Sequence, residues 1–93
     1  MIRRTRDKRT GDVRLTFSLP DAAHEGAVSV VGDFNSWTPG VHTLAKRSNG
    51  TRSVALSLPP GTRARFRYLG EGGRWFDDHD ADALDHDGGI IHA

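Results

Sequence analysis

The chain has 93 residues, the length of one small domain, and is 35% hydrophobic and 27% charged. This balance is typical of a soluble folded domain and excludes a largely disordered chain. No apolar run is long enough to span a membrane, and no apolar segment follows the first arginines as in a signal peptide. Cysteine is absent, which excludes disulfides and thiolate metal sites and favours a reducing, cytoplasmic location.

The net charge of +1 conceals an uneven distribution along the chain. We expect a flexible basic tail at residues 1–11 and a folded domain at residues 12–93. Such a tail can bind nucleic acid or anionic lipid, but a solvated terminus is the simpler interpretation, and we expect neither nucleic acid nor membrane as a partner. The basic residues are Arg3, Arg4, Arg6, Lys8 and Arg9, and the acids near the other end are Asp77, Asp78, Asp80, Asp82, Asp85 and Asp87.

The first half of the domain is predicted to form strands around one long loop. Val13 to Leu19 alternates apolar and polar side chains, which predicts a half-buried strand followed by a connection at 21–26. Residues 27–31 are largely apolar and β-branched, which indicates a strand buried on both faces. Residues 32–40 have the turn chemistry of a loop, although they include two aromatic residues. A short strand is predicted at 41–45.

The second half repeats the pattern of strands and turns. An Asn-Gly turn at 48–50 precedes a strand at 53–58, and a Pro-Pro-Gly turn precedes a strand at 63–68. A Gly-rich turn leads to a strand at 74–76, then to an Asp-rich loop and a closing strand at 89–92. About seven short strands with regular turns predict an all-β antiparallel sandwich, and no segment has a helical period.

Two tryptophans are the first candidates for a binding role. Trp37 and Trp75 both lie beside turns rather than in an alternating core pattern. A pyranose ring has a face of slightly positive C–H groups, which stacks on the slightly negative face of an indole. Two such platforms at a fixed angle would select a curved α-1,4-glucan over a flat chain. The spacing alone leaves an alternative open, in which both tryptophans cap the core.

The Asp-rich loop and the arginine stripe at 63, 65 and 67 are open to plainer interpretations. The loop begins like a calcium-binding EF-hand, but Ala83 and Gly89 stand where that motif needs glycine and glutamate. The histidines near these acids lack a zinc spacing, and the acids do not face each other across a cleft as in a glycosidase. We therefore expect no metal, no cofactor and no enzymatic activity. The stripe is typical of a solvated sheet face, although Arg67 has donors for sugar hydroxyls.

Two blocks of the sequence resemble the glycogen-binding modules found at the N-terminus of isoamylases and branching enzymes and in the β subunit of AMP-activated protein kinase. The first block is Val-Val-Gly-Asp-Phe-Asn-Ser-Trp at 30–37. The second is Phe-Arg-Tyr-Leu at 66–69 with the turn and tryptophan at 71–75. The closing Gly-Ile-Ile at 89–91 is similar as well. The resemblance covers most of the chain after residue 12 and implies an immunoglobulin-like, early-set sandwich that binds glycogen- or starch-like α-glucan or maltooligosaccharides.

The resemblance also implies roles for particular residues. Trp37 and Trp75 stand at the family's two sugar-stacking tryptophans, and Arg67 stands at its basic sugar-contacting residue. Leu84 aligns with a leucine that some members insert into the curve of the glucan.

Two departures from the family pattern affect this assignment. Gly88 replaces a sugar-binding asparagine of the kinase-subunit modules, and His86, two residues before it, is the candidate to assist. Glu71 replaces the usual aspartate of the turn. The missing asparagine leaves a second hypothesis open, in which the fold is a protein-interaction module that docks onto a glucan-metabolising enzyme. Phe34 and Asn35 are interpreted structurally, as a core anchor and a backbone clamp for the loop.

Overall fold

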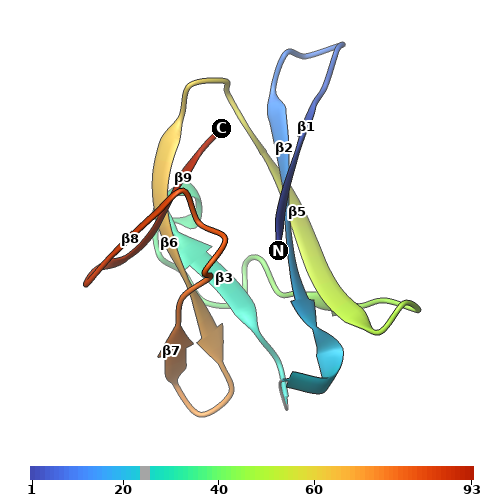
Figure 1. Ribbon diagram of the computed structural model, residues 1–93, viewed down its shortest axis with the longest axis vertical. Coiled ribbons are helices and arrows are strands. Elements are labelled where there is room, and N and C mark those ends of the chain that lie inside the picture. The colour runs from blue at the N-terminus through green and yellow to red at the C-terminus, as the bar shows by residue number, and fades with distance from the viewer. Residues whose placement is uncertain (24–25) are drawn as a thin grey trace.

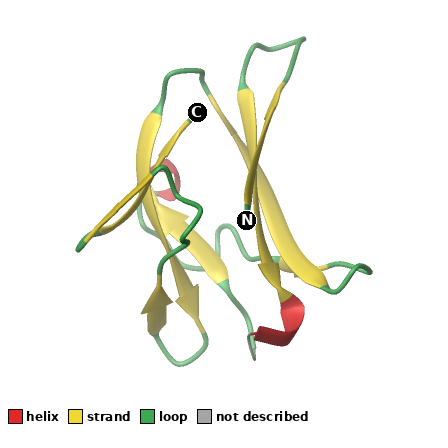
Figure 2. Ribbon diagram, in the orientation of Figure 1, coloured by secondary structure: helices red, strands yellow, loops and turns green. Residues whose placement is uncertain are grey.

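The computed structural model describes residues 1–23 and 26–93, and it forms two antiparallel sheets packed face to face (Figures 1 and 2). The first sheet has the order β1-β2-β5-β4, and the second has the order β3-β6-β9-β8, with β7 also paired to β6. The predicted all-β antiparallel sandwich is therefore confirmed. The strands are β1 (Ile2–Arg6), β2 (Val13–Pro20), β3 (Ser29–Gly32), β4 (Ala45–Lys46), β5 (Thr51–Leu58), β6 (Arg63–Gly70), β7 (Arg74–Phe76), β8 (Ala83–Asp85) and β9 (Gly88–His92), and the 3₁₀ turns are η1 (Asp21–Ala23) and η2 (Asp33–Asn35).

The core lies between the sheets and follows the alternation seen in the sequence. In β2 the side chains of Leu15, Phe17 and Leu19 are buried, while their neighbours face outward. Phe66 and Tyr68 of β6 meet Phe17 from the opposite sheet, and the Phe17 and Phe66 ring centroids lie 5.1 Å apart. Burial of each such side chain is worth about 1.5–3 kcal/mol, so this aromatic contact holds the two sheets together. All four residues of β3 are buried, as the apolar run predicted.

The N-terminal segment differs from the expected flexible tail. Residues 2–6 form β1, an edge strand in register with β2 from Ile2 opposite Phe17 to Arg6 opposite Val13. Ile2 packs against the core, and the strand is otherwise polar, so its sequence lacks the alternation that predicts a strand. The backbone hydrogen bonds of β2, and not an apolar face, give this segment its extended form.

Two other predictions of strand extent were wrong. The strand expected at 41–45 is reduced to Ala45–Lys46, and Thr43 makes only an isolated bridge to Ser29. The Asp-rich loop contains an unpredicted strand, β8, because Ala83 to Asp85 turns back along β9. The described residues thus form nine strands rather than about seven. Residues 24–25 of the predicted connection at 21–26 lie outside the described residues. No helix among the described residues is long and apolar enough to cross a membrane.

Candidate functional site

An open hollow on the second sheet brings together residues from distant parts of the sequence. It is lined by Trp37, Arg67, Trp75, His86 and Asp87, with a volume of about 270 Å³. Four of these five residues are candidates named from the sequence. The fifth candidate, Leu84, is 45% exposed on β8 but does not line the hollow.

Trp37 is held in an uncommon backbone conformation directly after η2. Its φ is +56° and that of Ser36 is +55°, a left-handed conformation that costs a bulky residue about 1–3 kcal/mol. Its indole Nε1 donates a hydrogen bond to Asp33 Oδ1 at 2.9 Å, and Asp33 Oδ2 accepts from the backbone N–H of Arg65 at 2.9 Å. The ring is therefore fixed in orientation relative to β6, and its faces, rather than its N–H, remain for a ligand.

The loop that carries Trp37 is anchored as the sequence suggested. Phe34 packs against the core, with its ring 6.1 Å from that of Phe17. The Asn35 side chain accepts from Gly32 N and donates to Val30 O, both at 3.0 Å. Its second Nδ2 hydrogen points to His42 Nδ1 at 3.0 Å, so that nitrogen is the acceptor. Both structural interpretations are confirmed, and the loop is ordered before any ligand binds.

Trp75 approaches the hollow from the β6–β7 hairpin. It lies opposite Leu69 in the register and is 44% exposed. The next residue, Phe76, turns to the other side of the strand and stacks on Tyr68 with centroids 5.2 Å apart. The alternation of β7 therefore packs one aromatic residue, partly buried, against the core and presents the other to solvent.

Arg67 lines the hollow from the solvent face of β6, together with the two tryptophans, and is held by a carboxylate. Its Nε donates to Asp77 Oδ1 at 3.0 Å, and both side chains are about a third exposed. Guanidinium groups have five N–H donors, so this ion pair leaves the terminal nitrogens available for a ligand. Arg67 is thus oriented toward the hollow without losing its capacity to donate.

The position of Arg67 restricts residue 88 to glycine. Gly88 has a φ of +125°, which side-chain-bearing residues rarely adopt. A Cβ atom placed there would lie 2.7 Å from Arg67 Cγ and 2.9 Å from Phe66 O. The stem of Arg67 therefore occupies the space into which a side chain at 88 would project. In this protein a long basic residue at 67 and a glycine at 88 fit together.

Charged groups form the remaining wall of the hollow. His86 is nearly fully exposed, with its Nε2 3.5 Å from Asp87 Oδ2. Asp87 also lies 3.6 Å from Arg65 Nη1, and Asp85 accepts from the same nitrogen at 2.8 Å. The backbone N–H of Asp87 and the guanidinium of Arg65 hold the pKa of Asp85 below its usual range. Sequence reasoning missed Asp87, because only the β8–β9 turn distinguishes it from the other acids.

The other acids of the Asp-rich loop serve the fold. Asp78 is buried and accepts from the Tyr68 hydroxyl at 2.6 Å and from Asp80 N at 2.8 Å. Burial and this hydrogen bond raise the pKa of Tyr68 far above its usual range. Asp82 accepts from Arg4 and from the backbone N–H of His92. Within 1–23 and 26–93, no group of three or more His, Asp or Glu side chains is placed to hold a metal ion.

Three curated proteins are similar to parts of the chain. The chain is 39% identical over 69 residues to the 1,4-alpha-glucan branching enzyme GlgB of Deinococcus radiodurans, covering 73% of this chain and 9% of that enzyme. It is 43% identical over 47 residues to GlgB 2 of Xanthomonas campestris pv. campestris, covering 50% and 6%. It is 28% identical over 60 residues to the amylopullulanase of Thermoanaerobacter thermohydrosulfuricus, covering 60% and 4%. No family model matches the chain.

These matches support a coarse conclusion about the chain. It spans less than a tenth of the length of each relative, so the similarity concerns a small part of long enzymes. The protein is therefore similar to a domain associated with glucan-branching and glucan-debranching enzymes.

Proposed function

We propose that this domain is a non-catalytic carbohydrate-binding module for α-1,4/α-1,6-glucan. The observation that supports this most directly is the hollow that Trp37, Trp75 and Arg67 line together. In this proposal the two indole faces stack on successive pyranose rings, and Arg67 donates hydrogen bonds to sugar hydroxyls. The similarity to glucan-branching enzymes supports the choice of sugar.

The strained backbone at Trp37 supports a binding role for that residue. A left-handed conformation in a bulky residue lowers stability, and such strain is concentrated at functional sites. The hydrogen bonds of Asp33 and Asn35 offset this cost and fix the ring before binding. A ring already fixed loses little conformational entropy on contact with a sugar, which favours affinity.

His86 and Leu84 have subordinate roles in the proposal. His86 lines the hollow and offers a ring nitrogen to a sugar hydroxyl in place of the family asparagine. Leu84 is exposed on β8, next to the strand that carries Gly88, and it contacts only a ligand long enough to extend beyond the hollow. Removing Leu84 is therefore expected to affect binding of long glucans more than binding of short ones.

The test is a titration with β-cyclodextrin, followed by tryptophan fluorescence for the wild type and by calorimetry for each variant. Stacking of a base on an aromatic side chain is worth about 1–3 kcal/mol, and each 1.4 kcal/mol is tenfold in affinity. If the stacking of a sugar contributes a similar free energy, Trp75→Ala weakens binding about tenfold or more, while Trp75→Phe retains part of the affinity. Val41→Ala, which removes another exposed apolar side chain, is the control and leaves affinity unchanged. Absence of binding by the folded wild type would refute the proposal.

A second candidate function is docking onto a glucan-metabolising enzyme. The relatives favour it, since each contains the matched segment within a much longer enzyme. If docking is the function, substitutions at Trp37 and Trp75 leave enzyme binding intact. Co-sedimentation with a branching enzyme in the presence and absence of glucan separates direct docking from a bridge made by the polysaccharide.

A further inference from the structure

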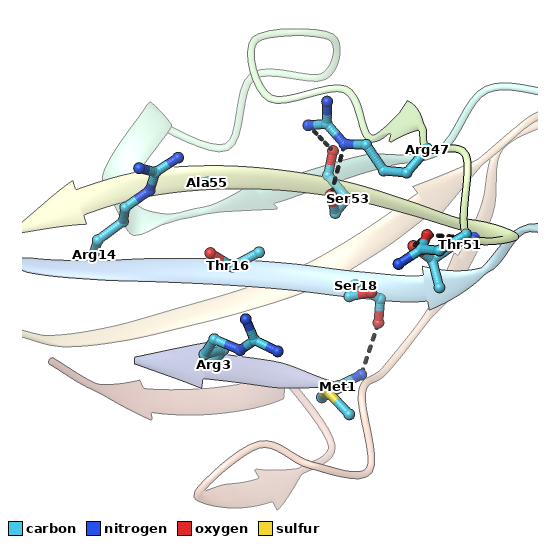
Figure 3. A pocket seen from close by; sticks show the side chains of 10 residues that line it. Met1, Arg3, Arg14, Thr16, Ser18, Arg47, Thr51, Ser53 and Ala55 are labelled. Atoms are coloured by element: carbon cyan, nitrogen blue, oxygen red, sulfur yellow. Dashed lines mark hydrogen bonds between the residues drawn. The ribbon is translucent and has the colours of Figure 1, made fainter. Parts of the chain in front are cut away.

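The outer face of the first sheet carries a second, smaller hollow on the side of the sandwich away from the core. It has a volume of about 240 Å³ and includes three arginines: Arg3 on β1, Arg14 on β2, and Arg47 beside β5 (Figure 3). Its floor consists of small side chains, most of them hydroxyl-bearing. The complete lining is Met1, Arg3, Arg14, Thr16, Ser18, Arg47, Asn49, Thr51, Ser53 and Ala55.

The strand register explains why the floor is shallow and polar. Arg3 lies opposite Thr16, and Thr16 lies opposite Ala55, so two small residues adjoin one arginine across three strands. Ser18 lies opposite Ser53 in the next outward-facing row. The long arginine side chains therefore surround a group of small residues, most of which have hydroxyl groups that can donate hydrogen bonds.

The arginines around this hollow have no carboxylate partner among the described residues, unlike several arginines elsewhere in the molecule. None of the described residues that line it is acidic. Arg4, Arg52, Arg65 and Arg67 each have a carboxylate within ion-pair distance, whereas the structure shows none for Arg3, Arg14 or Arg47 among the described residues. Like charges on neighbouring strands destabilise a sheet, so an anion bound among them would relieve repulsion.

Arg47 is already positioned for such an anion. Its Nε donates to Ser53 Oγ at 2.9 Å and its Nη2 donates to Ser53 O at 3.3 Å, as the dashed lines in Figure 3 show. These two bonds hold the guanidinium plane over β5 and leave other N–H donors for a ligand. Guanidinium forks match the tetrahedral oxygens of phosphate, and hydroxyl groups donate to the same oxygens.

We propose that this hollow binds a phosphate monoester, carried by a free sugar phosphate or by a phosphorylated glucan. The size of the hollow and its hydroxyl floor favour a single phosphoryl group over an extended polyanion. No aromatic residue lines it, which disfavours nucleic acid, because single-stranded nucleic acids stack their bases on aromatic rings. The choice of a sugar as the carrier rests on the proposed glucan-binding function, whereas the hollow itself is separate from the proposed glucan site, which lies on the second sheet.

The experiment is a titration of the ¹⁵N-labelled protein with inorganic phosphate, with glucose 6-phosphate and with unphosphorylated glucose, followed by backbone amide shifts. Saturable shifts at Thr16, Ser18 and Ser53 are expected with both phosphates and not with glucose. Arg14→Gln should weaken phosphate binding about threefold to fivefold, as expected for one exposed charge pair. The matched control is Arg63→Gln, which removes an exposed arginine of the other sheet and should leave affinity unchanged.

Two further comparisons identify the source of the phosphate and the rival ligands. In the first, binding to phosphorylated amylopectin is compared with binding to enzymatically dephosphorylated amylopectin. A phosphorylated glucan is the ligand if the phosphorylated form binds more tightly and if this difference is lost in Arg14→Gln but retained in Trp75→Ala. If glucose 6-phosphate binds more tightly than inorganic phosphate and the two forms of amylopectin bind equally well, the ligand is a free sugar phosphate. Shifts on this face with a polyglutamate peptide or an oligonucleotide, and none with either phosphate, would overturn the proposal.

Discussion

At the scale of single residues, the candidate glucan site depends on pairs of residues in which one limits the orientation of the other or the space open to it. Asp33 binds the Trp37 indole with one oxygen and the backbone of β6 with the other. Arg67 occupies the space that a side chain at position 88 would need. The glycine at 88 is therefore a structural partner of the arginine, because a side chain at 88 would collide with the stem of Arg67.

This pairing makes a prediction for Gly88→Asn. Because the φ of +125° and the contact with Arg67 both oppose a side chain, we expect a loss of about 1–3 kcal/mol in the free energy of unfolding. Displacement of Arg67 should also weaken binding of β-cyclodextrin. Urea denaturation and calorimetry measure the two effects.

The control for this prediction is Gly72→Asn. Gly72 also has a positive φ, +78°, but no atom lies within 4 Å of a Cβ built there. Asparagine tolerates this conformation, so the control should cost less than the variant at 88. Equal stability of the two variants would show that Arg67 does not restrict position 88.

At the scale of elements, a buried arginine ties the end of β2 to β5. Arg52 is 3% exposed, and its Nε and Nη2 donate to Asp21 Oδ1 at 3.1 and 2.7 Å. Its Nη1 donates to the backbone carbonyl of Gly26. A buried charge lowers stability unless it is paired. The carboxylate of Asp21 at the start of η1 therefore stabilises the buried guanidinium group of Arg52 in β5.

Asp21→Asn tests this connection, because it removes the negative charge and preserves the shape of the side chain. Hydrogen bonds to charged groups are worth about 1.5–3 kcal/mol, so we expect a loss of stability in that range. Asp12→Asn is the control, since no ion pair involves Asp12 among the described residues, and it should change stability little. Differential scanning calorimetry gives both values, and indistinguishable melting temperatures would contradict the assignment.

At the scale of the whole molecule, opposite charges that are far apart in the sequence meet across the two sheets. Arg4 of β1 donates through Nη2 to Asp82 Oδ2 at 2.6 Å and through Nε to His92 O at 2.9 Å. The terminal amino group of Met1 lies 3.7 Å from Asp78 and 3.4 Å from Asp80. The basic N-terminal segment and the Asp-rich loop are therefore partners within the fold.

These contacts predict an acid-dependent stability. Partial burial raises the pKa of Asp82, but the hydrogen bonds from His92 N–H and Arg4 outweigh it, so the pKa lies below its usual range. Because the unfolded chain binds this proton more readily, Asp82 contributes stability above about pH 4. That contribution is lost as the pH falls through the folded-state pKa.

Denaturation by urea at pH 7 and at pH 2.5 tests this prediction with Asp82→Asn. The variant should be less stable than the wild type at pH 7, and the difference should shrink toward pH 2.5, because the wild-type carboxyl binds a proton as the pH falls. Asp12→Asn, which removes a carboxylate with no ion pair among the described residues, is the control. A difference between wild type and Asp82→Asn that persists unchanged in acid would show that the Arg4–Asp82 contact does not supply it.

The sequence by itself determined the sandwich, most of its strands and four residues that line the hollow. Alternation in β2 and β6 and turn residues between strands are local signals, and they place Phe17, Phe66 and Tyr68 in the core. The anchoring of the Trp37 loop by Phe34 and Asn35 was predictable for the same reason, since both partners lie within or beside one short segment.

Only the tertiary structure decided the rest, because those features depend on residues distant in sequence. A polar edge strand such as β1 has no apolar period, and its pairing with β2 is supplied by backbone hydrogen bonds. Two features appear only when the strands are placed in register: the conflict between Arg67 and a side chain at 88, and the lack of carboxylates around Arg3 and Arg14 within 1–23 and 26–93. Sequence patterns report local burial, whereas charge pairing and steric fit depend on which strands become neighbours.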